Sequence, residues 1–328
     1  MTRINDSNAL TFAPEVIAAQ DALKAAGIGA ANILAQPLAE ARETNRIFQR
    51  FLNVPVPDVG HIVEHRLDHL AHPVNVRLYY PASERPGPLP AYLHIHGGGF
   101  AQGDINSLDR WKREIANEAH LVTVGIEYAL SPEAHYPVAI EQVIGALRWL
   151  RDQAATLGLD GERIAVGGDS AGGNLALNAL LRLRDQNDDF VKTGIIIYGM
   201  LSADHDTPSH QTLGDGRYGL STEKLAWYWE RYAGDAARFQ DPGVAPLYAD
   251  VSHLPPLLLL AAALDPLLDD TLNLAKKLDA AGQPTEPRIY PGVPHAFIAM
   301  TRILPQAREA RDDVIAHLKQ HLFIRAGN

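Results

Sequence analysis

The chain has 328 residues, a formal net charge of −10 at pH 7 and no cysteine. The acidic balance argues against nucleic acid or an anionic membrane as the main partner, because both attract basic surfaces. The lack of cysteine excludes disulfide bonds, thiolate catalysis and cysteine-ligated zinc.

The first fifty residues are expected to be helical, since Val16, Ala19 and Leu23 recur at helical spacing. Residues 1–15 lack the apolar core of a signal peptide. The longest apolar run, at 255–264, is too short to span a bilayer as a helix. These features predict a cytoplasmic protein.

Strand-like and helix-like segments then alternate along the chain. The apolar alternation at 74–80 predicts a half-buried strand, with the more polar 61–70 as its partner. Further strands are expected at 91–96, 121–128, 164–167, 194–199, 257–263 and 286–290, and helices at 107–119, 137–156, 171–184, 268–281 and 303–321. This order predicts an α/β fold with a mostly parallel sheet covered on both faces. Reactive groups in such sheets gather at the C-terminal ends of the strands.

The strand at 164–167 runs into GDSAG, residues 168–172, and a helix is expected to follow. A G-x-S-x-G motif between a strand and a helix is typical of a nucleophile elbow, a sharp turn that holds the serine above the sheet. The alternative is a glycine-rich turn whose serine only caps the helix. The position between strand and helix favours Ser170 as a nucleophile.

A serine nucleophile needs a base, and the base needs a third group to orient it. In this fold the carboxylate follows the serine in the chain, and the histidine comes last. Asp265 directly follows a predicted strand and is the expected carboxylate. Asp269 and Asp270 compete with it, but they suit the first turn of the next helix, where carboxylates stabilise the helix dipole.

His295 is the predicted base, because it lies in a loop after the last strand and after Asp265. His253 precedes Asp265, which is the wrong order. His317 and His321 fall in the final helix and are interpreted as solvated or packing residues.

The motif HGGG at 96–99 follows a predicted strand. Acyl transfer to a serine passes through a tetrahedral oxyanion, which needs preorganised N–H donors. We expect Ala171, which follows the nucleophile, and the loop at 96–99 to supply them. A phosphate cradle is disfavoured, because G-x-G-x-x-G and a Lys-Ser/Thr pair are both missing. A flexible linker fits poorly between an apolar strand and Phe100.

The pattern H-x-x-E-H at 61–65 matches a metalloprotease signature, which requires a helix. His69 and His72 follow it. We expect an edge strand here, where charged and polar side chains discourage aggregation. No metal site and no cofactor are therefore expected.

The motifs together resemble the hormone-sensitive-lipase-like esterases, the bacterial family IV carboxylesterases. The motifs that carry the resemblance are HGGGF at 96–100, GDSAGG at 168–173, DPL at 265–267 and PH at 294–295. The resemblance runs from about residue 60 to the C-terminus. It implies a single α/β-hydrolase domain over 1–328, with Ser170 as nucleophile, His295 as base and Asp265 as its orienting acid. By the same resemblance, Gly98, Gly99 and Ala171 are the expected donors to the oxyanion.

The resemblance also extends to YALSPE at 128–133, where Ala129 replaces the arginine that is usual in the family. A second departure is His-Ala-Phe in place of His-Gly-Phe after Pro294. His96 is expected to shape the glycine loop, and Gly97 to let the chain turn. The family often forms homodimers, which makes a homodimer the assembly to test.

The family commonly has a helical cap, here expected at about 1–50 and 203–240. Within the second segment, residues 221–232 predict a helix that Ser221 can cap. Its stripe consists of Leu225, Tyr228, Trp229 and Tyr232. The stripe indicates either an aromatic wall for substrate or packing of the cap onto the body. Phe100, Trp227 and Tyr228 are the expected substrate-binding residues.

The function expected from these residues is that of a serine carboxylesterase acting on small, short-chain acyl esters with water. A deacetylase, lactonase or amidase would use the same triad. A non-catalytic small-molecule receptor is the alternative from another class.

Overall fold

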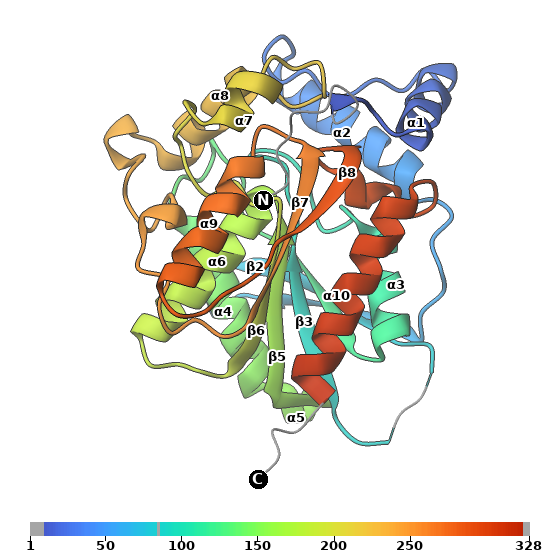
Figure 1. Ribbon diagram of the computed structural model, residues 1–328. Helices are drawn as coiled ribbons and strands as arrows, with labels where there is room; N and C mark the ends of the chain where they lie inside the picture. The colour runs from blue at the N-terminus through green and yellow to red at the C-terminus, as the bar shows by residue number, and fades with distance from the viewer. Residues whose placement is uncertain (1–9, 84–85, 324–328) are drawn as a thin grey trace.

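The computed structural model describes residues 10–83 and 86–323, and within them eight strands form one sheet in the order β1-β2-β4-β3-β5-β6-β7-β8 (Figure 1). The strands are β1 (His61–Leu67), β2 (Val74–Tyr80), β3 (Leu89–Ile95), β4 (Val122–Glu127), β5 (Leu159–Asp169), β6 (Val191–Ile197), β7 (Leu257–Leu264) and β8 (Arg288–Pro294). Strand β2 is antiparallel to both of its neighbours, and the strands from β4 to β8 are parallel.

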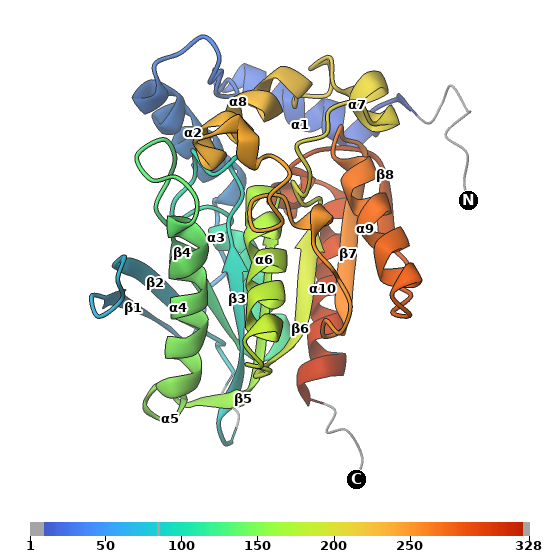
Figure 2. The same ribbon diagram turned by 90° about the vertical axis from the view of Figure 1, so that its left-hand side faces the viewer.

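Helices cover both faces of this sheet (Figures 1 and 2). One face carries α3 (Asp109–Ala119) and α10 (Pro305–Phe323), and the other carries α4 (Val138–Asp152), α6 (Ala171–Asp185) and α9 (Leu268–Ala280). The short α5 (Ala154–Leu157) leads into β5. The central strands are apolar along most of their length and buried on both sides. The predicted α/β class and mostly parallel sheet are confirmed.

Four further helices lie over one end of the sheet, above the C-terminal ends of the parallel strands (Figure 2). They are α1 (Pro14–Ala25), α2 (Leu38–Asn53), α7 (Pro208–Leu213) and α8 (Thr222–Ala233), and we call them the cap helices. The hydroxyl of Ser221 accepts a 3.2 Å hydrogen bond from the N–H of Lys224, which caps α8 as expected. The short 3-10 turns are η2 (Ala236–Arg238), η3 (Pro246–Tyr248) and η4 (Phe297–Met300).

Several bounds differ from the sequence-based expectations. The first fifty residues form two helices separated by a loop, and residues 1–9 lie outside the described part of the chain. The strand expected at 164–167 is the last part of the longer β5, which begins after the left-handed Gly158. The last strand continues to Pro294, so His295 directly follows it.

The H-x-x-E-H segment forms the edge strand β1 and not a helix. Glu64 forms an ion pair of 2.6 Å with Arg77 on the neighbouring strand, and the ring of His61 stacks on Tyr80. In residues 10–83 and 86–323, no group of three or more potential ligands gathers to hold a metal ion. The pairing on β1 gives its charged residues a structural role.

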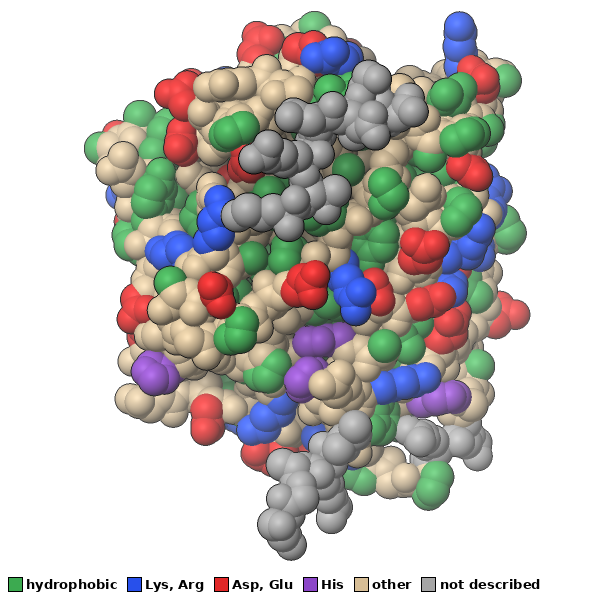
Figure 3. All heavy atoms as spheres, in the orientation of Figure 1, with side chains coloured by type: hydrophobic (Ala, Val, Ile, Leu, Met, Phe, Trp, Pro, Cys, Tyr) green, Lys and Arg blue, Asp and Glu red, His purple; other side chains and the backbone are tan. Residues whose placement is uncertain are grey.

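Acidic and basic side chains are interspersed on the face that carries α10 (Figure 3). None of the helices in the described residues has both the length and the apolar character needed to cross a bilayer.

Candidate active site

Ser170, Asp265 and His295 each directly follow a parallel strand, β5, β7 and β8 respectively. The Nε2 atom of His295 lies 2.9 Å from Oγ of Ser170, and its Nδ1 atom lies 2.6 Å from Oδ2 of Asp265. The three strands end at the same edge of the sheet. Their backbone geometry therefore brings the three predicted residues into one hydrogen-bonded chain.

Ser170 occupies a strained turn between β5 and α6, with φ +56° and ψ −119°. Its N–H donates to the carbonyl of Ile197 on β6, which fixes the turn to the sheet. Both flanking glycines need their small size. A Cβ at Gly168 would lie 2.5 Å from backbone atoms, and one at Gly172 would lie 2.0 Å from the carbonyl oxygen of Ile95. The end of β3, the end of β5 and the start of α6 therefore approach one another closely beneath the serine.

Asp265 is fully buried, and its Oδ1 accepts a 2.9 Å hydrogen bond from the N–H of Leu267. Its other oxygen accepts a hydrogen bond from Nδ1–H of His295, which leaves Nε2 free to accept a hydrogen bond from the hydroxyl of Ser170. This tautomer is the one a general base toward serine requires.

The two competing carboxylates serve other parts of the fold. Asp269 accepts the N–H of Ser209 in α7 at 2.7 Å. Asp270 accepts the N–H groups of Leu201 and Ser202, which follow β6, at 2.7 and 3.1 Å. Burial raises the pKa of Asp270 to about 8. Both residues lie in the first turn of α9, as expected, and hold the chain that leads to the second cap segment.

The competing histidines lie away from Ser170. His253 precedes β7, which begins at Leu257, and so lies near the N-terminal end of that strand. His317 and His321 lie in α10 with their rings 4.4 Å apart. The Nε2 atom of His317 contacts the hydroxyl of Thr193 at 2.6 Å. None of the three contacts the Ser170–His295 pair.

The glycine loop presents backbone donors beside the serine. Gly98 and Gly99 have φ values of +116° and +59°, which favour glycine. In residues 10–83 and 86–323, neither N–H has a hydrogen-bond acceptor. Ala171 is the first residue of α6, where helical geometry supplies no acceptor for its N–H. Three N–H groups are thus available to an oxyanion near Ser170.

Gly97 does not have a positive φ, so its expected role as the turning residue is not what requires glycine there. Its N–H donates to Oδ1 of Asp169 at 3.0 Å, and a Cβ would lie 2.5 Å from Oδ2 of the same side chain. Asp169 has no role in the sequence-based expectations, although it is part of the GDSAG motif. The same Oδ1 lies 3.3 Å from Nε2 of His94, whose Nδ1 contacts the hydroxyl of Tyr92.

His96 shapes the glycine loop from its other side. Its Nδ1 atom donates to the carbonyl of Gly97 at 2.8 Å, and its ring stacks on Tyr128 at 4.3 Å. Burial lowers the pKa of His96 to about 4, so the ring is neutral at pH 7.

A cavity of about 130 Å³ adjoins Ser170 and His295. Two cap helices contribute to its wall: Asn45 and Gln49 come from α2, and Leu225 and Tyr228 come from α8. The ring of Tyr228 lies directly over Gly99, where an added Cβ would come within 2.2 Å of it. The hydroxyl of Tyr228 donates to Oε1 of Gln102 at 3.0 Å.

Two of the expected substrate-binding residues do not line this cavity. Phe100 is 1% exposed, and its ring stacks on Tyr232 at 3.7 Å. Trp227 lies outside the wall, with the guanidinium of Arg231 over its ring at 3.9 Å. The two interpretations of the α8 stripe apply to different residues. Tyr228 lines the cavity, and Tyr232 packs the helix onto the body.

An arginine from α2 supports the loop that contains Ala129. Arg42 forms two hydrogen bonds with the carboxylate of Glu133, at 2.6 and 2.7 Å, and donates to the carbonyls of Ala101 and Ser131. Its guanidinium lowers the pKa of Glu133. No motif or spacing along the chain indicates this long-range contact.

Comparison with known proteins agrees with this architecture. A family described as the alpha/beta hydrolase fold matches residues 92–299. An ethyl acetate hydrolase from Pseudomonas putida is 36% identical over 254 residues, which are 76% of this chain and 80% of the relative.

Two solved structures are similar over nearly the whole chain. The carboxylesterase EstE1, from a metagenomic library, is 31% identical with a TM-score of 0.85, over 89% of this chain and 99% of its own. A hyperthermophilic esterase from the archaeon Pyrobaculum calidifontis is 30% identical with a TM-score of 0.87, over 94% and 98% of the two chains. The chain therefore belongs to the α/β-hydrolase family, as a hormone-sensitive-lipase-like member.

Proposed function

We propose that this protein is a serine carboxylesterase with Ser170 as its nucleophile. The observation that carries the proposal is the chain from buried Asp265 through His295 to Ser170, beside N–H groups at Gly98 and Gly99 that have no acceptor among the described residues. A capping serine in a glycine-rich turn would need neither the histidine nor the donors.

The reaction begins when His295 accepts the hydroxyl proton of Ser170 at Nε2 and Oγ attacks the ester carbonyl. The carbonyl oxygen becomes an oxyanion, which accepts hydrogen bonds from Gly98, Gly99 and Ala171. Asp265 stabilises the imidazolium without taking its proton. His295 then protonates the alcohol oxygen as the bond between that oxygen and the acyl carbon breaks.

The second half of the reaction replaces the alcohol with water. His295 accepts a proton from water, and the hydroxide oxygen attacks the acyl carbon bound to Ser170. The oxyanion forms again at the same N–H groups. Return of the proton to Oγ of Ser170 releases the carboxylic acid and restores the enzyme.

A small acyl group suits the cavity of about 130 Å³ at Ser170. The similarity to an ethyl acetate hydrolase and to two esterases supports the same substrate class. In this proposal, segments 1–50 and 203–240 act as one cap of a single domain. The enzyme uses water and a small ester as partners in the cytoplasm, without a cofactor.

Hydrolysis of p-nitrophenyl acetate by the purified protein tests the proposal. The Ser170→Ala variant should lose about 10⁶-fold in kcat, since removal of the nucleophile disables the whole triad. A melting temperature close to that of the wild type would exclude misfolding. An unchanged rate in this variant would contradict the proposed nucleophile.

A further inference from the structure

A second cavity, of about 350 Å³, adjoins the one at Ser170. The two share Asn45 and Gln49 of α2 and Ser107 of the facing loop. We call the larger cavity the outer chamber. Among the side chains that line it, Val54 and Val56 are the apolar ones. To reach the outer chamber, a substrate at Ser170 would have to pass between α2 and the loop at 103–109.

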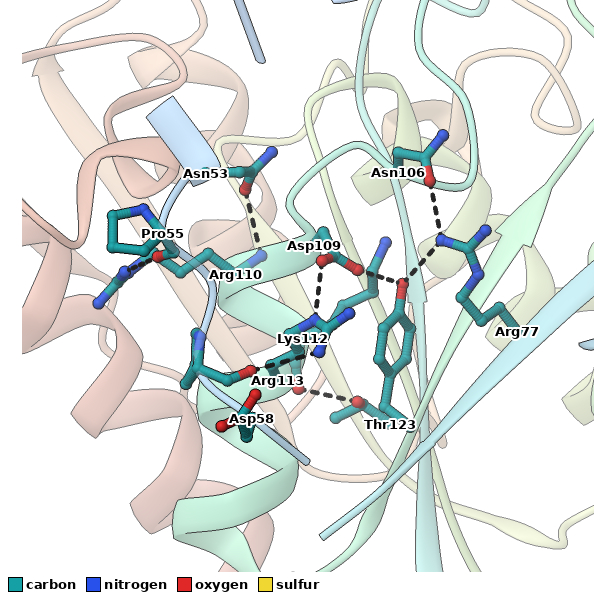
Figure 4. A network of polar contacts seen from close by, with 12 residues as sticks. Asn53, Pro55, Asp58, Arg77, Asn106, Asp109, Arg110, Lys112, Arg113 and Thr123 are labelled. Atoms are coloured by element: carbon teal, nitrogen blue, oxygen red, sulfur yellow. Dashed lines mark hydrogen bonds and ion pairs between the residues drawn. The ribbon is translucent and has the colours of Figure 1, made fainter. Parts of the chain in front are cut away.

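The polar groups on the loop side of the outer chamber already have hydrogen-bond partners within the protein (Figure 4). Asn106 accepts from Arg77 at 2.8 Å, and Asp109 accepts from the hydroxyl of Tyr79 and from Arg113. The buried ammonium of Lys112 donates to two carbonyls of the same loop, at 2.9 and 2.7 Å. This wall is preorganised and has few free donors or acceptors for a ligand.

The α2 side differs, because some of its polar groups have no partner. In residues 10–83 and 86–323, the side chains of Asn45, Gln49 and Arg50 make no hydrogen bond or ion pair. Oε1 of Gln49 is buried as well as unpartnered. An unpaired buried carbonyl oxygen costs free energy until a donor reaches it. Arg50 is exposed, so Asn45 and Gln49 are the groups placed to meet a substrate.

The cavity at Ser170, which we call the inner cavity, has two ends that belong to opposite faces of the sheet. Leu225 and Tyr228 pack with the apolar cluster on the α6 face. Helix α2 packs against η4, and its Phe48 and Phe51 join the cluster of Phe297 on the α10 face. The α2 end thus adjoins the segment that directly follows His295.

His295 must protonate the departing alcohol, so the alcohol lies within reach of Nε2. Ala296 and Ala299, which follow His295, line the inner cavity together with Gln49. Building on the proposed esterase function, we propose that the outer chamber binds the alcohol part of the substrate, and that this alcohol carries hydroxyl groups. Gln49 and Asn45 are then specificity-determining residues, whose side-chain amides form hydrogen bonds with a hydroxyl group of the alcohol.

The test compares three acetates that share one acyl group: ethyl acetate, 2-hydroxyethyl acetate and 2,3-dihydroxypropyl acetate. Release of acetic acid gives kcat/KM for each. Gln49→Met keeps the length of the side chain and removes its polar atoms. It should lower kcat/KM for the hydroxylated esters relative to ethyl acetate by about 3- to 10-fold, the effect of one hydrogen bond.

Asn45→Leu, one turn earlier on α2, should shift the ratio in the same direction. Gln20→Met is the matched control, because it makes the same chemical change at an exposed site on α1 that lines neither cavity. A ratio that stays the same in wild type, Gln49→Met and Asn45→Leu would overturn the inference while the esterase function stood. Failure of the wild type to hydrolyse any of the three acetates would overturn both.

Discussion

The triad and the cap reach the same cavity, but they are held in different ways. Each triad residue directly follows a parallel strand, so the sheet itself sets its position. The cap helices depend on side-chain contacts between distant segments, such as Arg42 with Glu133 and Tyr228 with Gln102. The positions of the proposed catalytic residues are thus set by the backbone, while the cap wall of the cavity depends on side-chain packing. The effects of substitutions in the two regions should therefore differ in magnitude and in the property that changes.

The largest effect is expected where the backbone-held region is broken. Asp265→Asn should lower kcat by about 10⁴-fold with little change in KM, because the imidazole loses its orienting acceptor and adopts the wrong tautomer. Steady-state kinetics on p-nitrophenyl acetate measure this. Asp269→Asn is the control, since Asp269 holds α7 and not His295. A loss below tenfold in Asp265→Asn would mean that another group orients the base.

An intermediate effect is expected where the two regions meet. Gly99→Ala would place a methyl group 2.2 Å from the ring of Tyr228 and on a backbone with φ +59°. Displacement of this loop should remove one oxyanion donor and lower kcat by roughly 10²–10³-fold. Gly27→Ala, at φ +68° with open space around it, measures the cost of the backbone angle alone. Wild-type kcat in Gly99→Ala would exclude Gly99 as a donor.

The smallest effect is expected in the anchor of the second cap segment and concerns stability. Burial raises the pKa of Asp270 from 3.8 to about 8. A carboxyl with a raised folded-state pKa contributes stability that is complete below pH 3.8 and is lost as the pH rises through 8. The side chain in Asp270→Asn does not titrate. The free energy of unfolding of this variant, relative to that of the wild type, should therefore rise by a few kcal/mol between pH 4 and pH 9.

Urea unfolding of wild type and Asp270→Asn at pH 4, 7 and 9 measures this difference. Asp21→Asn, at an exposed position on α1, controls for the loss of one negative charge. A difference between wild type and Asp270→Asn that does not vary with pH would show that Asp270 is ionised in the folded protein.

The contrast also explains what the sequence could predict. Ser170, Asp265 and His295 could be predicted to lie together, because each belongs to a local motif at a strand end and they follow the chain order of a serine triad. The role of Asp169 could not be predicted, although it lies in one of those motifs. Its contact with Gly97 joins β5 to the glycine loop, and no spacing rule reveals it.

Contacts of the cap were harder to predict, since they depend on how helices lie on the body. The sequence alone could have excluded Trp227 as a cavity residue, because it falls outside the helical stripe that contains Leu225 and Tyr228. Which member of that stripe reaches the cavity could not be predicted. The answer depends on where α8 sits over Gly99, a position set by residues from other elements.

The ring of Tyr228 over Gly99 has a consequence for protein engineering. Exchange of residues 203–240 for the matching segment of a relative is an obvious way to change substrate range. Such a graft removes the flat surface that confines Gly99, even though every motif residue stays in place. A chimera of this kind should therefore retain Tyr228 and its hydrogen bond to Gln102, so that new selectivity is not gained at the expense of turnover.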